Sequence, residues 1–307
     1  MKKVLVTGAL GFIGYHLTEL LLNQGVEVVA IDGRIERERA SEYEMKEMSF
    51  LRNSHYKLVN QKLQETSIAD LADGCDAVFH LSMPSFLKVG RHSKRVEEEM
   101  KNTKKVIQAS QGKVLVYLSS LEIYGKRYGS ISEKTPLNPV TKVGKFKKQE
   151  ENLLIDAESE SVIKIIRTPL VYGPWQPNQF VFQHYFVHEK LPPLYKIEGE
   201  KFHYDALYVE DVCQAMYKAS ERKDQSETIN LSSGREGEWQ NGVEWCIGEQ
   251  LDPRDDKTMQ CTISNRESVN KLDFTNLTPI KEGLAKQREH TENMMKLDPT
   301  IYRRRSE

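Results

Sequence analysis

The strongest constraint on the fold of this chain is a glycine-rich turn near its start. The apolar run Val4-Leu5-Val6 leads into Thr7-Gly8-Ala9-Leu10-Gly11-Phe12-Ile13-Gly14, and the segment from Ile13 to Leu22 has apolar residues at helical spacing. A β-branched run from Val26 to Ile31 follows and ends at Asp32. A strand, a turn, a helix and a second strand in this order predict a parallel sheet covered by helices.

The alternation of strand and helix patterns continues along the chain. Apolar runs at 56–59, 77–81, 114–118 and 163–167 indicate further strands with helices between them. After Gly173, prolines and aromatic residues become dense, which is typical of a smaller region built over such a sheet. We therefore expect an α/β fold, a Rossmann-type doubly wound parallel sheet with a smaller discontinuous substrate-binding region.

Composition excludes several classes of protein. The 307 residues are 38% hydrophobic and 29% charged, which supports a solvated globular protein with a substantial core. The 44 basic and 45 acidic residues nearly cancel, so we expect no nucleic-acid partner. The sequence contains no apolar run long enough for a bilayer, and its four cysteines are scattered without metal-ligand spacing. We expect a cytoplasmic protein with reduced thiols, no membrane partner and no metal site.

The glycine turn also predicts a ligand. Glycines let the backbone approach a pyrophosphate, whose charge then lies at the helix N-terminus. Asp32 follows at the distance where an acid can bind a ribose 2′-hydroxyl. This carboxylate repels a 2′-phosphate and so favours NAD over NADP, although Arg34 could pair with the phosphate and partly reverse that preference.

Further motifs follow in order. They are Val78-Phe79-His80-Leu81-Ser82, Tyr117 to Gly125, Arg167 through Val171-Tyr172-Gly173-Pro174, and Asp205 to Val212. With the G-x-x-G-x-x-G spacing, they resemble the extended short-chain dehydrogenase/reductases, namely the NAD-dependent epimerase/dehydratase family of nucleotide-sugar enzymes. The resemblance runs from Lys3 to about Leu284 and implies a nucleotide-sugar substrate and a homodimer. It also implies cofactor contacts by Gly8, Gly11, Phe12, Ile13, Gly14, Asp32, Arg34, Leu63, Leu81, Ser82 and Lys147.

The resemblance suggests a domain organisation. We expect an NAD-binding Rossmann domain at 1–173 and the first part of the substrate region at 174–205. The chain then returns to the Rossmann domain at 206–234, adds the second part of the substrate region at 235–290 and ends in a tail at 291–307.

Leu170 and Tyr204 stand where relatives often have Asn and Arg near the substrate diphosphate.

The expected catalytic group departs from the family pattern at one position. The family uses a Ser or Thr together with a Tyr and a Lys spaced Y-x-x-x-K on a helix. Ser120 fits the Ser and Lys147 fits the Lys, but Val143 stands where the Tyr is expected. Valine has no titratable proton, so either another group supplies the proton transfer or the chain has lost the chemistry.

Glu122 is the candidate for that other group. In the family's sugar 4,6-dehydratases and glucuronate decarboxylases, a Glu follows the catalytic Ser or Thr by two residues, as Glu122 follows Ser120. In the dehydratases this Glu removes a proton next to a transient ketone. The alternative is a Glu that merely caps or pairs at the turn, and Leu121 replaces the Asp acid of several dehydratases.

The sequence thus predicts an NAD-dependent epimerase/dehydratase-like protein that exchanges hydride at sugar C4 with an atypical acid/base residue. Its catalytic residues would be Ser120, Glu122 and Lys147. Two alternatives stay open. One is a catalytically inactive NAD-binding partner or sensor, which Val143 favours. The other is a reductase of a small non-nucleotide carbonyl compound, which Leu170 and Tyr204 favour.

Overall fold

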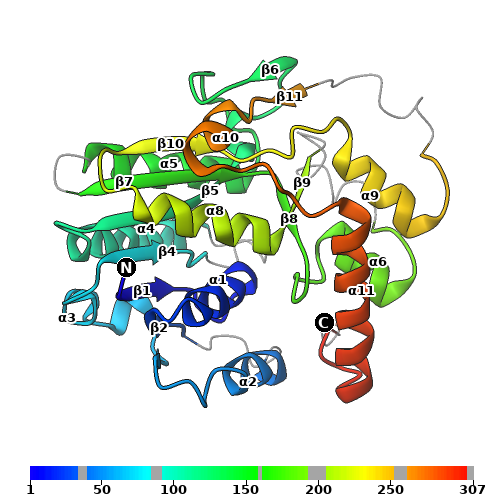
Figure 1. The fold of residues 1–307 in the computed structure, drawn as a ribbon. Helices are drawn as coiled ribbons and strands as arrows, with labels where there is room; N and C mark the ends of the chain where they lie inside the picture. The colour runs from blue at the N-terminus through cyan, green and yellow to red at the C-terminus, as the bar shows by residue number, and fades with distance from the viewer. Residues whose placement is uncertain (34–39, 84–91, 158–160, 193–204, 252–260, 303–307) are drawn as a thin grey trace. The chain divides into compact units, whose positions relative to one another are not determined.

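A central sheet organises the computed structural model, which describes residues 1–33, 40–83, 92–157, 161–192, 205–251 and 261–302 (Figure 1). In these residues the sheet has seven strands in the order β10-β7-β5-β4-β1-β2-β3. Their bounds are β1 Lys3–Thr7, β2 Glu27–Ile31, β3 Tyr56–Val59, β4 Ala77–His80, β5 Val114–Ser120, β7 Val162–Thr168 and β10 Glu227–Asn230.

The strands in the middle of the sheet run parallel. β1 pairs with β2 on one side and with β4 on the other, β2 pairs with β3, and β4 pairs with β5. The strand order reverses between β1 and β4. In doubly wound sheets, ligands bind at the carboxyl ends of the strands beside such a reversal, which here is the edge formed by Thr7 and His80.

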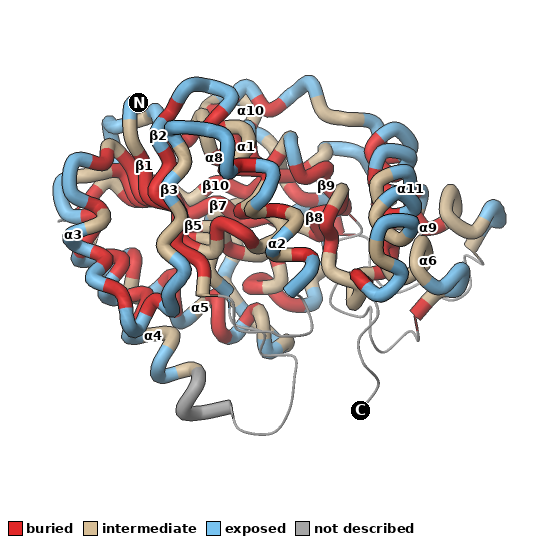
Figure 2. Tube along the Cα trace, turned by 90° about the horizontal axis from the view of Figure 1, so that it is seen from below, coloured by how far each residue is buried: buried red, intermediate tan, exposed pale blue. Residues whose placement is uncertain are grey.

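Both faces of the sheet are buried. Leu5, Val29 and Ile31 join the core beneath α3 (Ile68–Ala72), α4 (His92–Ala109) and α5 (Lys142–Asp156). The alternate residues Val4 and Val6 are also fully buried, and α1 (Phe12–Asn23) contacts β1 and β2. Figure 2 shows β1 buried, and the burial is complete from Val4 to Thr7. Successive strand side chains point to opposite faces, so burial of both sets confirms the expected doubly wound fold.

The chain divides into two compact units. Unit 1 comprises Met1–Ser119, Phe146–Ile166 and Met216–Thr228, and unit 2 comprises Ser120–Lys145, Arg167–Ala215 and Ile229–Glu307. Unit 1 also holds α2 (Ala40–Met48) and the 3-10 helix η2 (Leu63–Glu65). The helix α8 (Val209–Glu221) begins in unit 2 and ends in unit 1. The domain boundaries expected from the sequence stay a prediction.

Unit 2 is built from short strands and helices. Its strands form two small parallel pairs, β6 (Gly129–Ile131) with β11 (Cys261–Ile263) and β8 (Leu170–Tyr172) with β9 (Ala206–Tyr208). Its helices are η3 (Leu121–Tyr124), α6 (Val181–His188), α9 (Glu238–Ile247), α10 (Arg266–Leu272) and α11 (Ile280–Leu297). Within the described part of the chain, every helix is too short or too polar to cross a bilayer.

Candidate functional site

The glycine turn between β1 and α1 is tightly packed. Gly8 has a φ of 72°, and a Cβ added there would lie 2.9 Å from the Ser82 backbone nitrogen. A Cβ added at Gly14 would lie 2.0 Å from the Gly8 carbonyl oxygen. A side chain at either position would collide with backbone, so glycine is required at both.

The first turn of α1 suits an anion. Gly11 is the N-cap and has no side chain, and the helix starts at Phe12 without an acidic residue in its first turn. The helix dipole and the first amides of Phe12 and Ile13 therefore face an approaching ligand with partial positive charge. Together with the close glycine packing, this arrangement fits the pyrophosphate of a dinucleotide.

Asp32 lies against the same turn. It follows β2 directly, and its carboxylate Oδ2 accepts a hydrogen bond of 2.9 Å from the Leu10 backbone nitrogen. The Leu10 carbonyl oxygen accepts in turn from the Nζ of Lys46, at 3.1 Å. Lys46 comes from α2 and is fully buried beside the carboxylate of Glu42, 2.6 Å away. The backbone of Leu10 is thus held at its nitrogen by Asp32 and at its carbonyl by Lys46.

The other expected cofactor residues of unit 1 lie at the same sheet edge. Leu81 and Ser82 follow β4, where their backbone nitrogens donate to the carbonyl and the hydroxyl of Thr7. Leu63 is buried at the start of η2, and the neighbouring Lys62 lies 3.0 Å from a Cβ added at Gly33. The predicted Arg34 contact and the Tyr204 substitution fall outside the described residues.

Lys147 lies in α5 and is almost completely buried. Its Nζ donates to the Tyr117 hydroxyl at 2.9 Å, to the Leu118 carbonyl at 3.0 Å and to the Glu150 carboxylate at 3.3 Å. Tyr117 also donates to Glu150. Burial raises the pKa of Tyr117 well above its usual value, so this phenol stays protonated and is a poor general base. Sequence reasoning did not find Glu150, because a glutamate after a lysine-rich run is typical of a solvated helix face.

Ser120 and Glu122 belong to unit 2. The Ser120 Oγ accepts from the Glu122 backbone nitrogen at 3.2 Å, which caps η3. The Glu122 side chain is half-buried, and burial raises the pKa of its carboxyl, while a hydrogen bond from the Thr141 side chain acts in the opposite direction. A carboxyl with a raised pKa is a better proton acceptor than an ordinary one, as long as it is ionised.

The first turn of α5 lies next to Glu122. Thr141 accepts a hydrogen bond from the Gly144 nitrogen at 2.9 Å, and a Cβ added at Gly144 would lie 2.4 Å from the Glu122 carbonyl oxygen. Val143 is part of this helical turn, as expected from the sequence. Val143, which has no titratable proton, is therefore the chain neighbour of Gly144, and Gly144 packs on Glu122.

Tyr124 is not placed to replace the missing tyrosine. Its side chain is fully buried, and its hydroxyl is bonded to the amide oxygen of Asn230 and to the guanidinium of Arg167. Burial raises the pKa of Tyr124. A buried phenol with two partners holds unit 2 together and is shielded from a substrate.

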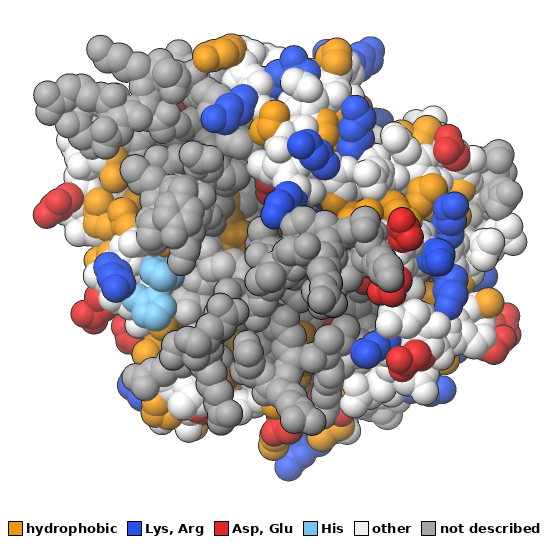
Figure 3. Space-filling model, turned by 180° about the vertical axis from the view of Figure 1, so that it is seen from behind, with side chains coloured by type: hydrophobic (Ala, Val, Ile, Leu, Met, Phe, Trp, Pro, Cys, Tyr) orange, Lys and Arg blue, Asp and Glu red, His pale blue; other side chains and the backbone are white. Residues whose placement is uncertain are grey.

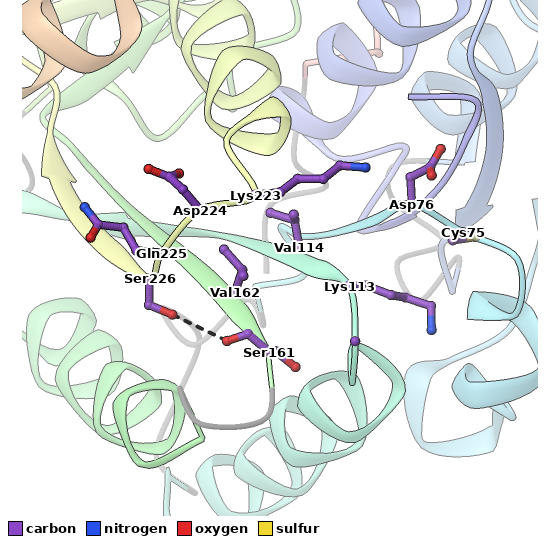
Figure 4. Close-up of a pocket in the computed structure, with 11 residues that line it drawn as sticks. Cys75, Asp76, Lys113, Val114, Ser161, Val162, Lys223, Asp224, Gln225 and Ser226 are labelled. Carbon is purple, nitrogen blue, oxygen red and sulfur yellow. Dashed lines mark hydrogen bonds between the residues drawn. The ribbon is translucent and has the colours of Figure 1, made fainter.

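The surface hollow shown in Figure 4 lies at the opposite edge of the sheet. It has a volume of about 540 Å³ and is lined by the residues that precede or begin β4, β5, β7 and β10, among them Asp76, Lys113, Val162 and Ser226. The Asp76 carboxylate already accepts from the Lys2 backbone nitrogen at 2.6 Å. On the face shown in Figure 3, basic side chains lie beside acidic ones.

Comparison with known proteins agrees with the family resemblance of the sequence motifs. The model of the NAD-dependent epimerase/dehydratase family matches residues 4–232. An uncharacterized UDP-glucose epimerase YtcB of Bacillus subtilis (strain 168) is 30% identical over 189 residues, which are 59% of this chain and 60% of that protein. A UDP-N-acetyl-alpha-D-glucosaminuronate decarboxylase of Bacillus cytotoxicus is 30% identical over 143 residues, 43% of this chain and 40% of that protein. The chain thus matches less than two thirds of either relative.

Among solved structures, a mutant UDP-glucuronic acid 4-epimerase from Bacillus cereus, in complex with a fluorinated UDP-sugar and NAD, has a similar fold. Its TM-score is 0.78 at 21% identity, covering 95% of this chain and 99% of that one. At this low sequence identity, the similarity shows a shared fold and does not extend to the activity of that enzyme.

Proposed function

Because the chain belongs to the NAD-dependent epimerase/dehydratase family, we propose that it is an enzyme that modifies a nucleotide-activated sugar by hydride exchange at C4. Relatives that are named as UDP-sugar epimerases and as a UDP-sugar decarboxylase support this substrate class. NAD, when bound, supplies the group that accepts and returns the hydride. The choice among epimerase, dehydratase and decarboxylase chemistry depends on what the acid/base residue does with the oxidised sugar.

The proposed cofactor site follows from the glycine turn. The glycines at 8, 11 and 14 let the turn pack closely on itself and on the residues after β4, and the start of α1 at Phe12 and Ile13 would face the charge of the diphosphate. Asp32 would bind the adenosine ribose, since its carboxylate lies against the turn. Leu63, Leu81 and Ser82 would line the site, and Lys147 would hold the nicotinamide ribose by exchanging one of its three hydrogen bonds, to Tyr117, Leu118 and Glu150, for a ribose hydroxyl.

The observation that carries the catalytic proposal is the environment of Glu122. Its carboxyl is half-buried, its pKa is raised by that burial, and Glu122 lies against the first turn of α5, where Val143 stands at the position of the family's tyrosine. We assign to Glu122 the proton transfer that valine cannot perform. Ser120 would donate its hydroxyl hydrogen to the reacting sugar oxygen, because its oxygen already accepts from the backbone.

A substrate panel and one variant test the proposal. The purified protein is incubated with NAD and with UDP-glucose, UDP-glucuronic acid or dTDP-glucose, and the products are identified by NMR and mass spectrometry. We expect E122Q to lower kcat by roughly 10²-fold or more, because the amide cannot take up the proton, while NAD affinity stays the same. E133Q is the control, since Glu133 accepts from the Asn230 backbone in the same unit. Full turnover by E122Q would remove Glu122 from the mechanism.

The second candidate function is an NAD-binding partner or sensor without catalysis, and Val143 is the observation that favours it. Such a protein would bind NAD and leave every sugar in the panel unchanged. If the loss of tyrosine removed the chemistry, V143Y would produce new turnover. If Glu122 has taken over, V143Y would add little to an activity that is already present.

A further inference from the structure

A buried hydrogen-bonded network joins Lys147 to the turn between β1 and α1. At the turn, the Ser82 backbone nitrogen lies 3.4 Å from the Thr7 hydroxyl, and the same hydroxyl lies 2.8 Å from His80 Nδ1. His80 Nε2 lies 3.4 Å from the Thr103 hydroxyl, which donates to Glu150 Oε1 at 2.7 Å. All these residues belong to unit 1, and those from Thr7 to Glu150 are buried.

The direction of each bond can be deduced from chemistry. Burial lowers the pKa of His80 to about 4, so its ring is neutral at neutral pH and has one N–H. Thr103 donates its hydrogen to the Glu150 carboxylate, so its oxygen accepts from His80 Nε2–H. His80 Nδ1 then accepts from the Thr7 hydroxyl, whose oxygen accepts from the Ser82 N–H.

Glu150 is the acceptor at which two series of bonds meet. The series from Ser82 ends on its Oε1, and Tyr117 and Lys147 both donate to its Oε2. A carboxylate can accept at both oxygens, whereas the nitrogen of a glutamine amide cannot accept at all. Glu150 is 1% exposed, so these donors cannot exchange it for water. The negative charge of Glu150 also balances the buried ammonium of Lys147. Val143 carries no charge and cannot contribute to this balance.

We propose that Glu150 is a positioning residue for the dinucleotide site, fixing the Lys147 ammonium and, through His80, the Ser82 backbone that closes on Gly8. The inference rests on the proposed function in one respect, the contact of Lys147 with the nicotinamide ribose. Glu150 touches neither substrate nor cofactor in this role. It acts by holding the two groups that do.

The adjacent Glu151 provides a matched control. It lies on the same helix, is fully buried, and accepts a hydrogen bond of 2.6 Å from the Ser119 hydroxyl. Both glutamates therefore accept from a hydroxyl of β5, and of the two it is Glu150 to which the structure gives Lys147 a direct hydrogen bond. A general loss of packing would affect E150Q and E151Q alike, whereas a positioning role would affect E150Q.

The test measures NAD affinity by calorimetric titration of the wild type, E150Q, E151Q, K147M and the double variant K147M/E150Q. We expect E150Q to weaken NAD binding by about tenfold, in the range of a lost charge-assisted hydrogen bond, and E151Q by about twofold or less. In the K147M background, E150Q should lose the part of its effect that acts through the ammonium and keep the part that acts through His80 and Ser82. If E150Q does not fold, Y117F takes its place. It removes one hydrogen-bond donor to Glu150 and should give a smaller loss of NAD affinity.

Three results would overturn the inference. Equal affinities for E150Q and E151Q would show that the Lys147 contact has no special role. Full additivity of E150Q and K147M would show that Glu150 does not act through Lys147, which the inference requires. If the wild type binds NAD and Y117F and E150Q bind it with the same affinity, the positioning role is wrong but the proposed function stands. If the wild type fails to bind NAD, the proposed function itself is wrong.

Discussion

At the scale of single residues, burial raises the pKa of Glu122 and Thr141 moderates that increase. Its hydrogen bond favours the carboxylate and so counteracts the increase in pKa that burial causes. A general base works while it is ionised, so turnover should fall as pH drops through the Glu122 pKa, at a higher pH than for an ordinary carboxyl. We expect T141V to move this acidic limb of the kcat/KM profile to still higher pH.

T141S is the control for that shift, because it keeps a hydroxyl for both Glu122 and the Gly144 nitrogen. T141V should also lower the free energy of unfolding by about 1 kcal/mol, since it removes the hydrogen bond that caps α5. An acidic limb that stays in place in T141V would mean that a group other than Glu122 sets the profile.

The residues that the sequence predicted well are those whose role depends on the local chain. Gly8, Gly14 and Asp32 could be placed because a strand, a turn and a helix bring them together within 25 residues of sequence. Glu150 and Lys46 could not be placed. Both lie in charge-rich stretches that resemble solvated helices, and their burial arises from contacts with strands and turns distant in sequence.

At the scale of elements, α2 is attached to the glycine turn by a hydrogen bond from Lys46, which also forms a buried ion pair within α2. Lys46 donates both to Glu42 and to the Leu10 carbonyl, and neither charged side chain has appreciable exposure. K46M would leave the Glu42 carboxylate buried without its cation, so we expect a loss of roughly 3–5 kcal/mol in the free energy of unfolding. The measurement is urea unfolding at neutral pH.

The double variant E42Q/K46M separates the charge from the packing. It removes both members of the pair, so it should be more stable than K46M although it lacks one more native side chain. If the double variant is instead the less stable, then the ion pair does not explain the cost of K46M. K271M is a surface control, because its partner Glu267 is half-exposed and such pairs contribute about 0–1 kcal/mol.

Strands were easier to predict than the small pairs of unit 2. The runs at 114–118 and 163–167 became β5 and β7, because continuous β-branched and apolar residues are typical of strands buried on both faces. β6 and β11 have three residues each and come from segments about 130 residues apart. Their pairing depends on the tertiary fold, and neither segment has a local pattern strong enough to indicate it.

At the scale of the whole molecule, unit 1 gathers three separate stretches of the chain. The glycine turn, Asp32 and the end of β4 come from the first stretch, and Lys147 with Glu150 comes from the second. The proposed dinucleotide contacts therefore all lie in one compact unit, apart from Arg34, which is not described. A ligand that binds a folded unit but not its unfolded chain must stabilise that unit.

NAD should therefore raise the unfolding temperature of unit 1 in scanning calorimetry. At a concentration 100 times its Kd, the stabilisation is about 2.7 kcal/mol, which corresponds to a shift of roughly 5–10 °C. G14A should abolish the shift, since its Cβ would lie 2.0 Å from the Gly8 carbonyl oxygen. G25A is the control for a glycine substitution outside the turn: unlike the helical Gly14, Gly25 has a positive φ, of 74°, and a Cβ there meets nothing within 4 Å in the described structure. It should lower stability and keep the NAD shift. An equal loss of the shift in both variants would show that G14A acts through stability and not through the turn.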